Sequence, residues 1–161
     1  WQNDMKKWKY SGLALINEVN ALKPRAVLDV GCGYNEFRGK IDNLIGIDPY
    51  NDKADIQVST LEYRTTQKFD VMLCLGSVNF GSRDKIISEV GRCVDLLEDG
   101  GTMFFRVNPG VQHNKPEAKW IEFFAWNVPF IIELSEIFNL KVLDIRDDSN
   151  QRKYFIYRKV K

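Results

Sequence analysis

The sequence predicts an α/β fold whose mostly parallel sheet is covered by helices on both faces. Three observations support this prediction. Short apolar runs recur along the chain, segments with apolar residues at helical spacing separate them, and most of the runs are nearly continuous in apolar residues. Continuous apolar strands indicate a sheet that is buried on both faces. We therefore expect a doubly wound sheet in a three-layer sandwich.

The first half of the chain supplies a helix and four strands. Residues 8–22 carry apolar side chains at roughly helical spacing, and Pro24 stops this amphipathic helix. Strands are expected at 25–30, 43–48, 55–58 and 69–75. The third of these is the weakest. Only residues 34–42 separate the first two strands, so we expect a short helix between them.

A helix and a strand follow the fourth strand. Ser82 is a plausible N-cap, and the apolar residues that follow it line one face of the helix. Residues 99–101 (Asp-Gly-Gly) are expected to end this helix and to turn the chain into a strand at 102–107.

The last part of the chain predicts one more helix and two strands. The helix is expected to begin near Pro116, to be interrupted by Pro129 and to continue over 130–138. The strands are expected at 140–145 and 152–158. The link between them is too short for a parallel crossover, so this pair should be antiparallel.

Composition indicates an ordinary globular protein, with one domain expected over residues 1–161 and a core over 23–161. The 23 basic and 22 acidic residues leave a net charge of +1, which does not steer the chain towards nucleic acid or membrane. A single histidine and three cysteines without a C-x-x-C pair predict reduced thiols and no metal site. No apolar run reaches membrane-spanning length, and we expect a cytoplasmic protein.

The first strand ends in the segment with the strongest chemical signal, Asp29-Val-Gly31-Cys-Gly33. In open α/β sheets ligands bind beyond the carboxyl ends of the strands, and glycine lets the backbone turn tightly and approach the ligand. Asp29 is an acid inside an apolar strand. A buried carboxylate is costly unless it is paired. Its partner is expected to be loop amides or a cationic ligand group, such as an amine or a sulfonium.

Asp48, at the end of the second strand, narrows the choice of ligand. An acid at this place accepts hydrogen bonds from the ribose hydroxyls of an adenosine-type ligand and would repel a 2′-phosphate, which disfavours NADP. Glu36 occupies the position of the third glycine of a dinucleotide-binding loop and would face a pyrophosphate, which disfavours NAD.

Four segments in order resemble the class I S-adenosylmethionine-dependent methyltransferases. They are Val27–Gly33, Ile45–Asp48, Phe69–Leu75 and Leu96–Phe105. The resemblance spans roughly Leu22 to the C-terminus. It implies a Rossmann-like, doubly wound sheet of seven strands with an antiparallel C-terminal strand. It also implies that residues 1–22 form an N-terminal helix or lid. The compact chain further resembles methyltransferases of bacteriophage genomes.

The resemblance also implies a set of cofactor-binding residues. Asp29, Gly31 and Gly33 would hold the methionine end, Asp48 the ribose, and Leu75 and Gly76 the methionine amine through backbone groups. Pro49, Ser59, Thr60 and Leu61 would contact the adenine. Two departures stand out: Ser59 replaces an acid that many members carry, and Tyr34-Asn35 replaces a third glycine. Asn tolerates positive φ, so the turn can survive.

The residues that would carry catalysis are harder to identify. Methyl transfer is an in-line displacement that depends mainly on positioning. His113, in the loop after the fifth strand, has the intrinsic pKa of a general base, and the alternative is a loop histidine without a role. Asn79 and Phe80 stand where related DNA-methylating enzymes carry an [Asn/Asp]-Pro-Pro-[Tyr/Phe] motif. The prolines are missing here, which argues against amino-directed DNA enzymes as the nearest kin. The alternative is that Asn79 is a turn or cap residue.

The function expected from the sequence is therefore S-adenosylmethionine-dependent methyl transfer, with S-adenosylhomocysteine as the product. The expected acceptor is a small molecule, while nucleic acid and protein acceptors stay open and a membrane partner is not expected. A monomer and a homodimer are both compatible with the sequence. The alternative is a catalytically inactive, methyltransferase-like module that binds the cofactor or a partner. A nucleotide-dependent oxidoreductase is a third hypothesis.

Overall fold

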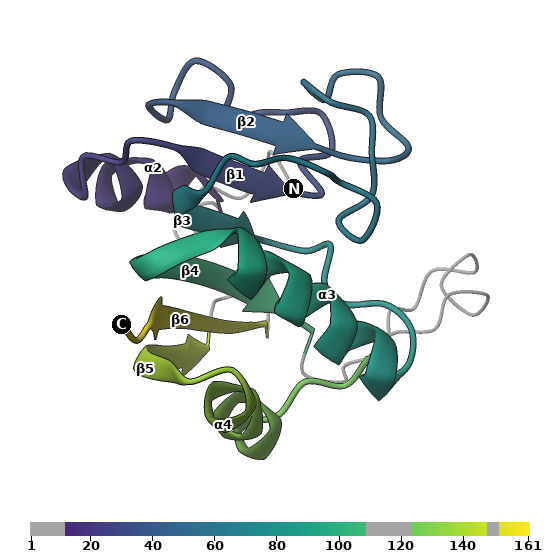
Figure 1. Ribbon diagram of the computed structural model, residues 1–161, viewed down its shortest axis with the longest axis vertical. Helices are drawn as coiled ribbons and strands as arrows, with labels where there is room; N and C mark the ends of the chain where they lie inside the picture. The colour runs from purple at the N-terminus through teal and green to yellow at the C-terminus, as the bar shows by residue number, and fades with distance from the viewer. Residues whose placement is uncertain (1–11, 109–123, 148–151) are drawn as a thin grey trace.

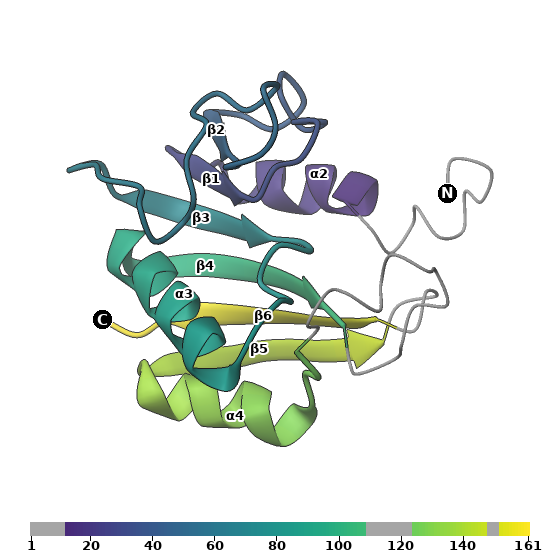
Figure 2. The same cartoon turned by 90° about the vertical axis from the view of Figure 1, so that its right-hand side faces the viewer.

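The computed structural model describes residues 12–108, 124–147 and 152–161, which form a three-layer α/β arrangement (Figure 1). A six-stranded sheet with the order β2-β1-β3-β4-β6-β5 makes the middle layer. One helix, α2, packs on one face, and α3 and α4 pack on the other (Figure 2). The strands are β1 Val27–Val30, β2 Leu44–Ile47, β3 Phe69–Cys74, β4 Leu97–Val107, β5 Leu140–Asp147 and β6 Lys153–Lys159. The helices are α2 Gly12–Ala21, α3 Arg83–Leu96 and α4 Val128–Ile137.

Strand directions follow the expected scheme. β1 pairs in parallel with β2 and β3, and β3 pairs in parallel with β4. β6 lies antiparallel to both β4 and β5, so the predicted antiparallel closing pair is confirmed. The class of fold predicted from the sequence, a mostly parallel α/β sheet with helices on both faces, is therefore confirmed.

The predicted number of seven strands is wrong, because the described residues form six. The segment 55–58, expected to be a strand, makes only one parallel bridge, between Ile47 and Ile56. The Asp55 carboxylate accepts the Gly46 N–H at 2.8 Å, and the Asp55 N–H donates to the Gly46 carbonyl oxygen. A side-chain oxygen thus takes the place of a backbone carbonyl next to β2, and a regular ladder does not form there.

The helix after β3 begins as predicted and ends differently. The Ser82 side chain accepts the Lys85 N–H at 3.2 Å, which confirms the N-cap of α3. The expected turn at residues 99–101 instead lies inside β4, which begins directly after the helix at Leu97. The register against β3 shifts in this stretch, and Gly100 adopts a φ of +80°. Because a bulge absorbs the Asp-Gly-Gly segment, the chain needs no separate loop.

Pro129 begins a helix rather than interrupting one. Residues 124–127 are not helical, and the predicted start near Pro116 lies outside the described residues. The Asn127 side chain caps α4 by accepting the Phe130 N–H at 2.9 Å, and Pro129 lies in the first turn, where a missing N–H costs nothing.

The short helix expected between the first two strands is also absent, since residues 34–42 form turns. Positive φ angles at Asn35 (58°) and Gly39 (77°) are incompatible with a continuous right-handed helix. The Asn35 value does confirm that asparagine can replace a glycine in this loop.

Two apolar clusters fill the space on either side of the sheet. The smaller one lies under α2 and includes Leu15 and Val19. The larger one lies under α3 and α4 and is rich in aromatic rings. Trp126 is fully buried there between Phe105, Phe130 and Phe155, and its indole N–H donates to the Val78 carbonyl oxygen at 3.0 Å. The packing of this ring therefore links α4 to the loop that follows β3.

Candidate functional site

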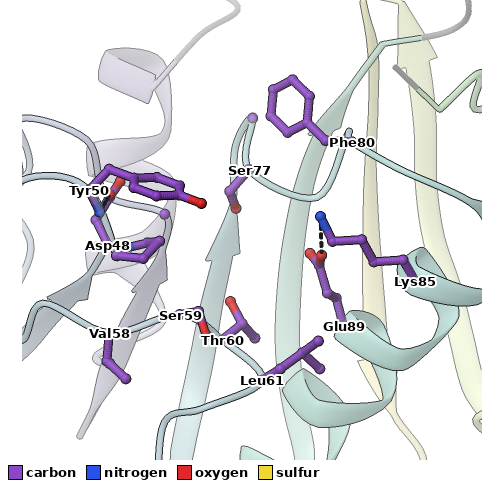
Figure 3. Close-up of a pocket in the computed structure, with 13 residues that line it drawn as sticks. Asp48, Tyr50, Val58, Ser59, Thr60, Leu61, Ser77, Phe80, Lys85 and Glu89 are labelled. Carbon is purple, nitrogen blue, oxygen red and sulfur yellow. Dashed lines mark hydrogen bonds and ion pairs between the residues drawn. The ribbon is translucent and has the colours of Figure 1, made fainter. Parts of the chain in front are cut away.

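A pocket of about 510 Å³ opens where the carboxyl ends of β1, β2 and β3 meet (Figure 3). Within the sheet, β2 lies on one side of β1, and β3, the next strand along the chain, lies on the other side of β1. The strand order therefore reverses at β1. Open α/β sheets bind ligands at such a switch point. Residues that lie far apart in the sequence meet there: Gly31 after β1, Asp48 and Pro49 after β2, and Gly76 and Ser77 after β3.

Gly31 and Ser77 bring the loops after β1 and β3 into close contact. Gly31 has a φ of +69°, and a Cβ atom at this position would lie 2.1 Å from the Cβ of Ser77. The Ser77 hydroxyl donates to the Val30 carbonyl oxygen at 2.7 Å, which holds the second loop against the end of β1. Only glycine fits at position 31, because both the backbone angle and the neighbouring side chain exclude a Cβ atom.

Asp48 organises the loops on the other side of the pocket. One of its carboxylate oxygens accepts the Gly33 N–H at 3.0 Å, and the other accepts the Tyr50 N–H at 2.8 Å. Each carboxylate oxygen can accept more than one hydrogen bond, so the group retains acceptor capacity towards the pocket. Asp48 thus supports the loop at Gly33 and presents a carboxylate to the pocket.

Asp29 is a buried carboxylate at the end of β1. Its exposure is 4%, and burial raises its pKa to about 7, with smaller contributions from the negative charges of Asp48 and Glu36. Among the described residues it has neither a hydrogen-bond donor nor a basic side chain as a partner. An acid without a partner in this position fits a cationic ligand group, because a positive charge would compensate the cost of its burial.

Apolar side chains supply part of the remaining lining of the pocket. Val58, Leu61 and Phe80 line it, together with Tyr50, whose side chain is 93% exposed. The Ser59 hydroxyl donates to the Glu62 carboxylate at 2.8 Å and accepts the Glu62 N–H at 3.2 Å, so its polar groups serve the local turn. Apolar and aromatic side chains of this kind can pack against an aromatic ring.

The described pocket contains most of the residues expected from the sequence. Gly31, Asp48, Pro49, Ser59, Thr60, Leu61 and Gly76 line it. Asp29, Gly33 and Leu75 do not, although the Gly33 N–H binds Asp48 and Leu75 packs towards the α2 face. The roles of all ten residues in binding a cofactor stay predictions.

Six residues that line the pocket were not assigned to the site from the sequence: Tyr50, Val58, Ser77, Phe80, Lys85 and Glu89. Tyr50 directly follows Pro49 and could have been found by extending that motif by one residue. Lys85 and Glu89 share one face of α3 at i, i+4 spacing, but such pairs are common on exposed helix surfaces. Nothing in the sequence shows that this face turns towards the ligand site.

Of the two candidate catalytic residues, the structure describes only one. His113 lies outside the described residues. Asn79 is buried in the middle of the loop after β3, and its side-chain amide donates to the Gly76 carbonyl oxygen at 3.0 Å and accepts the Asn108 N–H at 2.8 Å. The Asn79 carbonyl oxygen also accepts the Phe124 N–H at 2.7 Å. These contacts tie three segments together beside the pocket, and Asn79 is not among its lining residues.

In the described part of the chain, no three His, Cys, Asp or Glu side chains lie close enough together to hold a metal ion. Within the same part of the chain, none of the helices combines the length and the apolar character needed to cross a membrane. Cys74 and Cys93 are buried, and Cys32 is partly exposed; all three are free thiols.

Solved structures with the same architecture identify the fold. A 1,6-didemethyltoxoflavin-N1-methyltransferase from Burkholderia thailandensis, with bound S-adenosylhomocysteine, superposes with a TM-score of 0.73 at 15% identity, covering 100% of this chain and 84% of the other. An S-adenosylmethionine-dependent methyltransferase from Clostridium acetobutylicum gives 0.71 at 16% identity, covering 98% and 93%. The chain has the S-adenosylmethionine-dependent methyltransferase fold.

A third similar structure is the N-methyltransferase NodS from Bradyrhizobium japonicum in complex with S-adenosylhomocysteine, with a TM-score of 0.69 at 13% identity over 92% of this chain and 85% of the other. No protein-family model and no curated protein matches the sequence. The fold is therefore shared with these enzymes, while the residues have diverged far from theirs.

Proposed function

We propose that this chain binds S-adenosylmethionine in the switch-point pocket and transfers its methyl group to a small-molecule acceptor. One observation carries the proposal: a single pocket joins Gly31, Asp48 and Gly76, three residues from three strand ends that the sequence motifs separately assign to this cofactor. Solved structures of the same fold hold S-adenosylhomocysteine, which supports the choice of cofactor.

The chemistry of the lining residues fits each part of this cofactor. The Asp48 carboxylate accepts hydrogen bonds from the ribose hydroxyls. Tyr50, Val58 and Leu61 pack against the adenine ring, and removing this apolar surface from water favours binding. Asp29 does not line the pocket itself, but it lies two residues before Gly31, where its carboxylate would supply a negative charge for the amine of the methionine part.

The role of the chain in the reaction is to position two reactants. When bound, S-adenosylmethionine supplies an electrophilic methyl group that passes to a lone pair of the acceptor, while the C–S bond electrons go to sulfur and the acceptor proton leaves to a base or to water. The Gly31 loop and Gly76 line the pocket without side chains, so a ligand can lie against their backbone. Holding donor and acceptor in line lowers the barrier because the cost of bringing them together is met on binding.

A small-molecule acceptor is supported by the proteins of similar structure. One is named for methylating 1,6-didemethyltoxoflavin, and another, from Synechocystis, is a magnesium protoporphyrin IX methyltransferase with a TM-score of 0.69 at 10% identity over 91% of this chain. His113 stays the candidate general base in this proposal, and its test is the loss of methyl transfer, without loss of cofactor binding, in His113→Ala.

Calorimetric titration with S-adenosylhomocysteine tests the cofactor proposal. The wild type is expected to bind, and Asp48→Asn to bind about 10–100-fold more weakly, because a hydrogen bond to a charged group contributes about 1.5–3 kcal/mol. Asp48→Asn keeps an acceptor oxygen for only one of the two loop N–H groups and turns its NH2 group towards the other, so urea unfolding of the variant is measured alongside to show whether the loop survives. Asp52→Asn makes the same charge change at an exposed position nearby and is expected to bind as the wild type does. If the wild type does not bind, the proposal fails.

A binding module without catalysis is the second candidate function. The observation that favours it is the state of Asn79, whose side chain is engaged by two backbone groups and does not line the pocket. Incubation with radiolabelled S-adenosylmethionine and a broad panel of small-molecule, nucleic-acid and protein acceptors separates the two functions. Cofactor binding without transfer to any acceptor supports the module, and transfer to one acceptor excludes it.

A further inference from the structure

A charged pair on α3 forms the wall of the pocket opposite Asp48 (Figure 3). The Lys85 ammonium lies 3.7 Å from a carboxylate oxygen of Glu89, one helical turn further along. The Lys85 side chain is half exposed, whereas only 12% of the Glu89 side chain is exposed. The pair comes from a helix that the cofactor motifs do not include.

This pair is poorly explained as a device for stability alone. Exposed ion pairs contribute little, and a carboxylate that is largely withdrawn from water carries a desolvation cost. Burial raises the pKa of Glu89, while Lys85 lowers it. Leu61 lies beside Glu89 in the pocket (Figure 3). A largely buried acid that faces a ligand pocket and is paired with a half-exposed lysine has the character of a recognition group.

The arrangement of charges in the pocket indicates how a nucleoside would be oriented between its two walls. Of the lining residues that the structure describes, only Asp48 and Glu89 carry carboxylates, and Lys85 carries the one positive charge. Asp48 lies beside Tyr50 on one wall, Lys85 and Glu89 lie on the other, and Thr60 and Leu61 lie between them (Figure 3). A nucleoside whose ribose is held by Asp48 would therefore direct the far edge of its base towards the pair on α3.

We propose that Lys85 and Glu89 read the polar edge of the adenine ring and so make the pocket specific for an adenosine-type cofactor. Glu89 accepts a hydrogen bond from the exocyclic amine, and Lys85 donates one to the adjacent ring nitrogen N1. Adenine presents a donor beside an acceptor on this edge, and the pair presents an acceptor beside a donor. The inference rests on the proposed binding of S-adenosylmethionine in the same pocket.

Hypoxanthine is the discriminating base, since a carbonyl replaces its amine and N1 carries a hydrogen. Its edge therefore presents an acceptor facing Glu89 and a donor facing Lys85, the reverse of what the pair can satisfy. A site built to pair with a specific donor rejects the analogue that lacks it, because its own polar group is then left unpaired. The Ser59 hydroxyl is not available to distinguish the two bases, because it donates its hydrogen bond to the Glu62 carboxylate.

Calorimetric titration with S-adenosylhomocysteine and with its deaminated analogue, S-inosylhomocysteine, tests this inference. The wild type is expected to prefer the adenine form by roughly tenfold or more. Glu89→Gln should lose most of that preference, because an amide can accept from the amine or donate to the carbonyl. Asp95→Asn removes the same charge from an exposed position on the same helix and should retain the full preference.

Glu89→Asp is a second variant, which keeps the charge but withdraws it by one methylene group, and it should lose part of the preference. The outcomes separate the two proposals. A wild type that binds both ligands equally, or a Glu89→Gln variant with an unchanged preference, overturns the role of the pair while leaving cofactor binding intact. A Glu89→Gln variant that impairs only the use of the methyl acceptor overturns it too. A wild type that binds neither ligand refutes the proposed function itself.

Discussion

Asp29 shows how one residue can couple the site to pH. Its pKa in the folded chain is about 7, against an ordinary value of 3.8, and burial is the main cause. Between these values the folded chain holds a proton that the unfolded chain releases. The unfolded state is therefore favoured as pH rises from about 4 to 7, and the contribution of Asp29 to stability falls over this range.

We expect Asp29→Asn to gain stability relative to the wild type as pH rises from 5 to 8, because asparagine keeps the shape without the charge. Each pKa unit corresponds to about 1.4 kcal/mol, so the difference in the free energy of unfolding should grow by up to a few kcal/mol. Urea unfolding of both proteins at several pH values measures this difference, in which the titration of the other carboxyl groups cancels. A difference that is constant with pH would show that Asp29 is already ionised in the folded protein.

Gly31 is the residue whose replacement should disturb the site most directly. Gly31→Ala places a methyl group in a left-handed backbone conformation and against Ser77, so we expect a loss of about 2–5 kcal/mol in the free energy of unfolding. Gly39→Ala is the matched control, because Gly39 has a φ of +77° but no atom within 4 Å of the added Cβ. It should lose only about 1–2 kcal/mol. Equal losses in the two variants, measured by urea unfolding, would mean that the contact with Ser77 relaxes freely.

At the scale of elements, the shape of the pocket depends on how the loop between β3 and α3 is held in place. The loop after β3 runs past the pocket to α3, and the Ser82 cap fixes where that helix begins. Asn79 joins this loop to the end of β4 and to the segment that leads into α4. The buried Asn79 amide therefore helps to set the position of Lys85 and Glu89 relative to Gly76, together with the Ser77, Trp126 and Ser82 contacts of the same loop.

Asn79→Ala should lower the free energy of unfolding by about 1–3 kcal/mol, because it leaves the buried Asn108 N–H without its acceptor and the partly buried Gly76 carbonyl without its donor. Asn51→Ala removes an exposed acceptor of a single turn N–H and should change stability by about 0.5 kcal/mol or less. Thermal or urea unfolding compares the two. An Asn79→Ala protein that is as stable as the wild type but has lost methyl transfer would instead indicate a catalytic role.

The elements themselves were largely predictable from the sequence, and the exceptions have local causes. Apolar periodicity located five of the six strands of the ladder near their true bounds and α3 from its cap onward, whereas β4 begins earlier than expected because Gly100 allows a bulge. The seventh strand failed because the Asp55 side chain replaces a backbone group beside β2. A side chain that substitutes for a backbone hydrogen bond leaves no mark in the pattern of apolar residues.

At the scale of the whole molecule, the order of the strands creates the site. Because β1 lies between β2 and β3, the chain ends of these strands converge on one pocket, and residues from positions 31 to 89 come together there. Helices cover the two faces of the sheet, so this pocket forms at the edge where the strands end. Most of the lining residues with a glycine or acid motif could be anticipated, because strand-end motifs have a fixed meaning in this class of fold.

The sequence by itself determined the α/β class, the antiparallel closing strands, the glycine loop at Gly31 and the acid at Asp48. These features depend on local chemistry: apolar periodicity, the conformational freedom of glycine and an acid next to the end of a strand. Only the tertiary structure decided that the sheet has six strands, that Asp29 lacks a partner among the described residues, and that Lys85 and Glu89 face the same pocket as Asp48. Those features depend on contacts between segments that lie far apart in the sequence. The local pattern of residues in each segment does not specify such contacts.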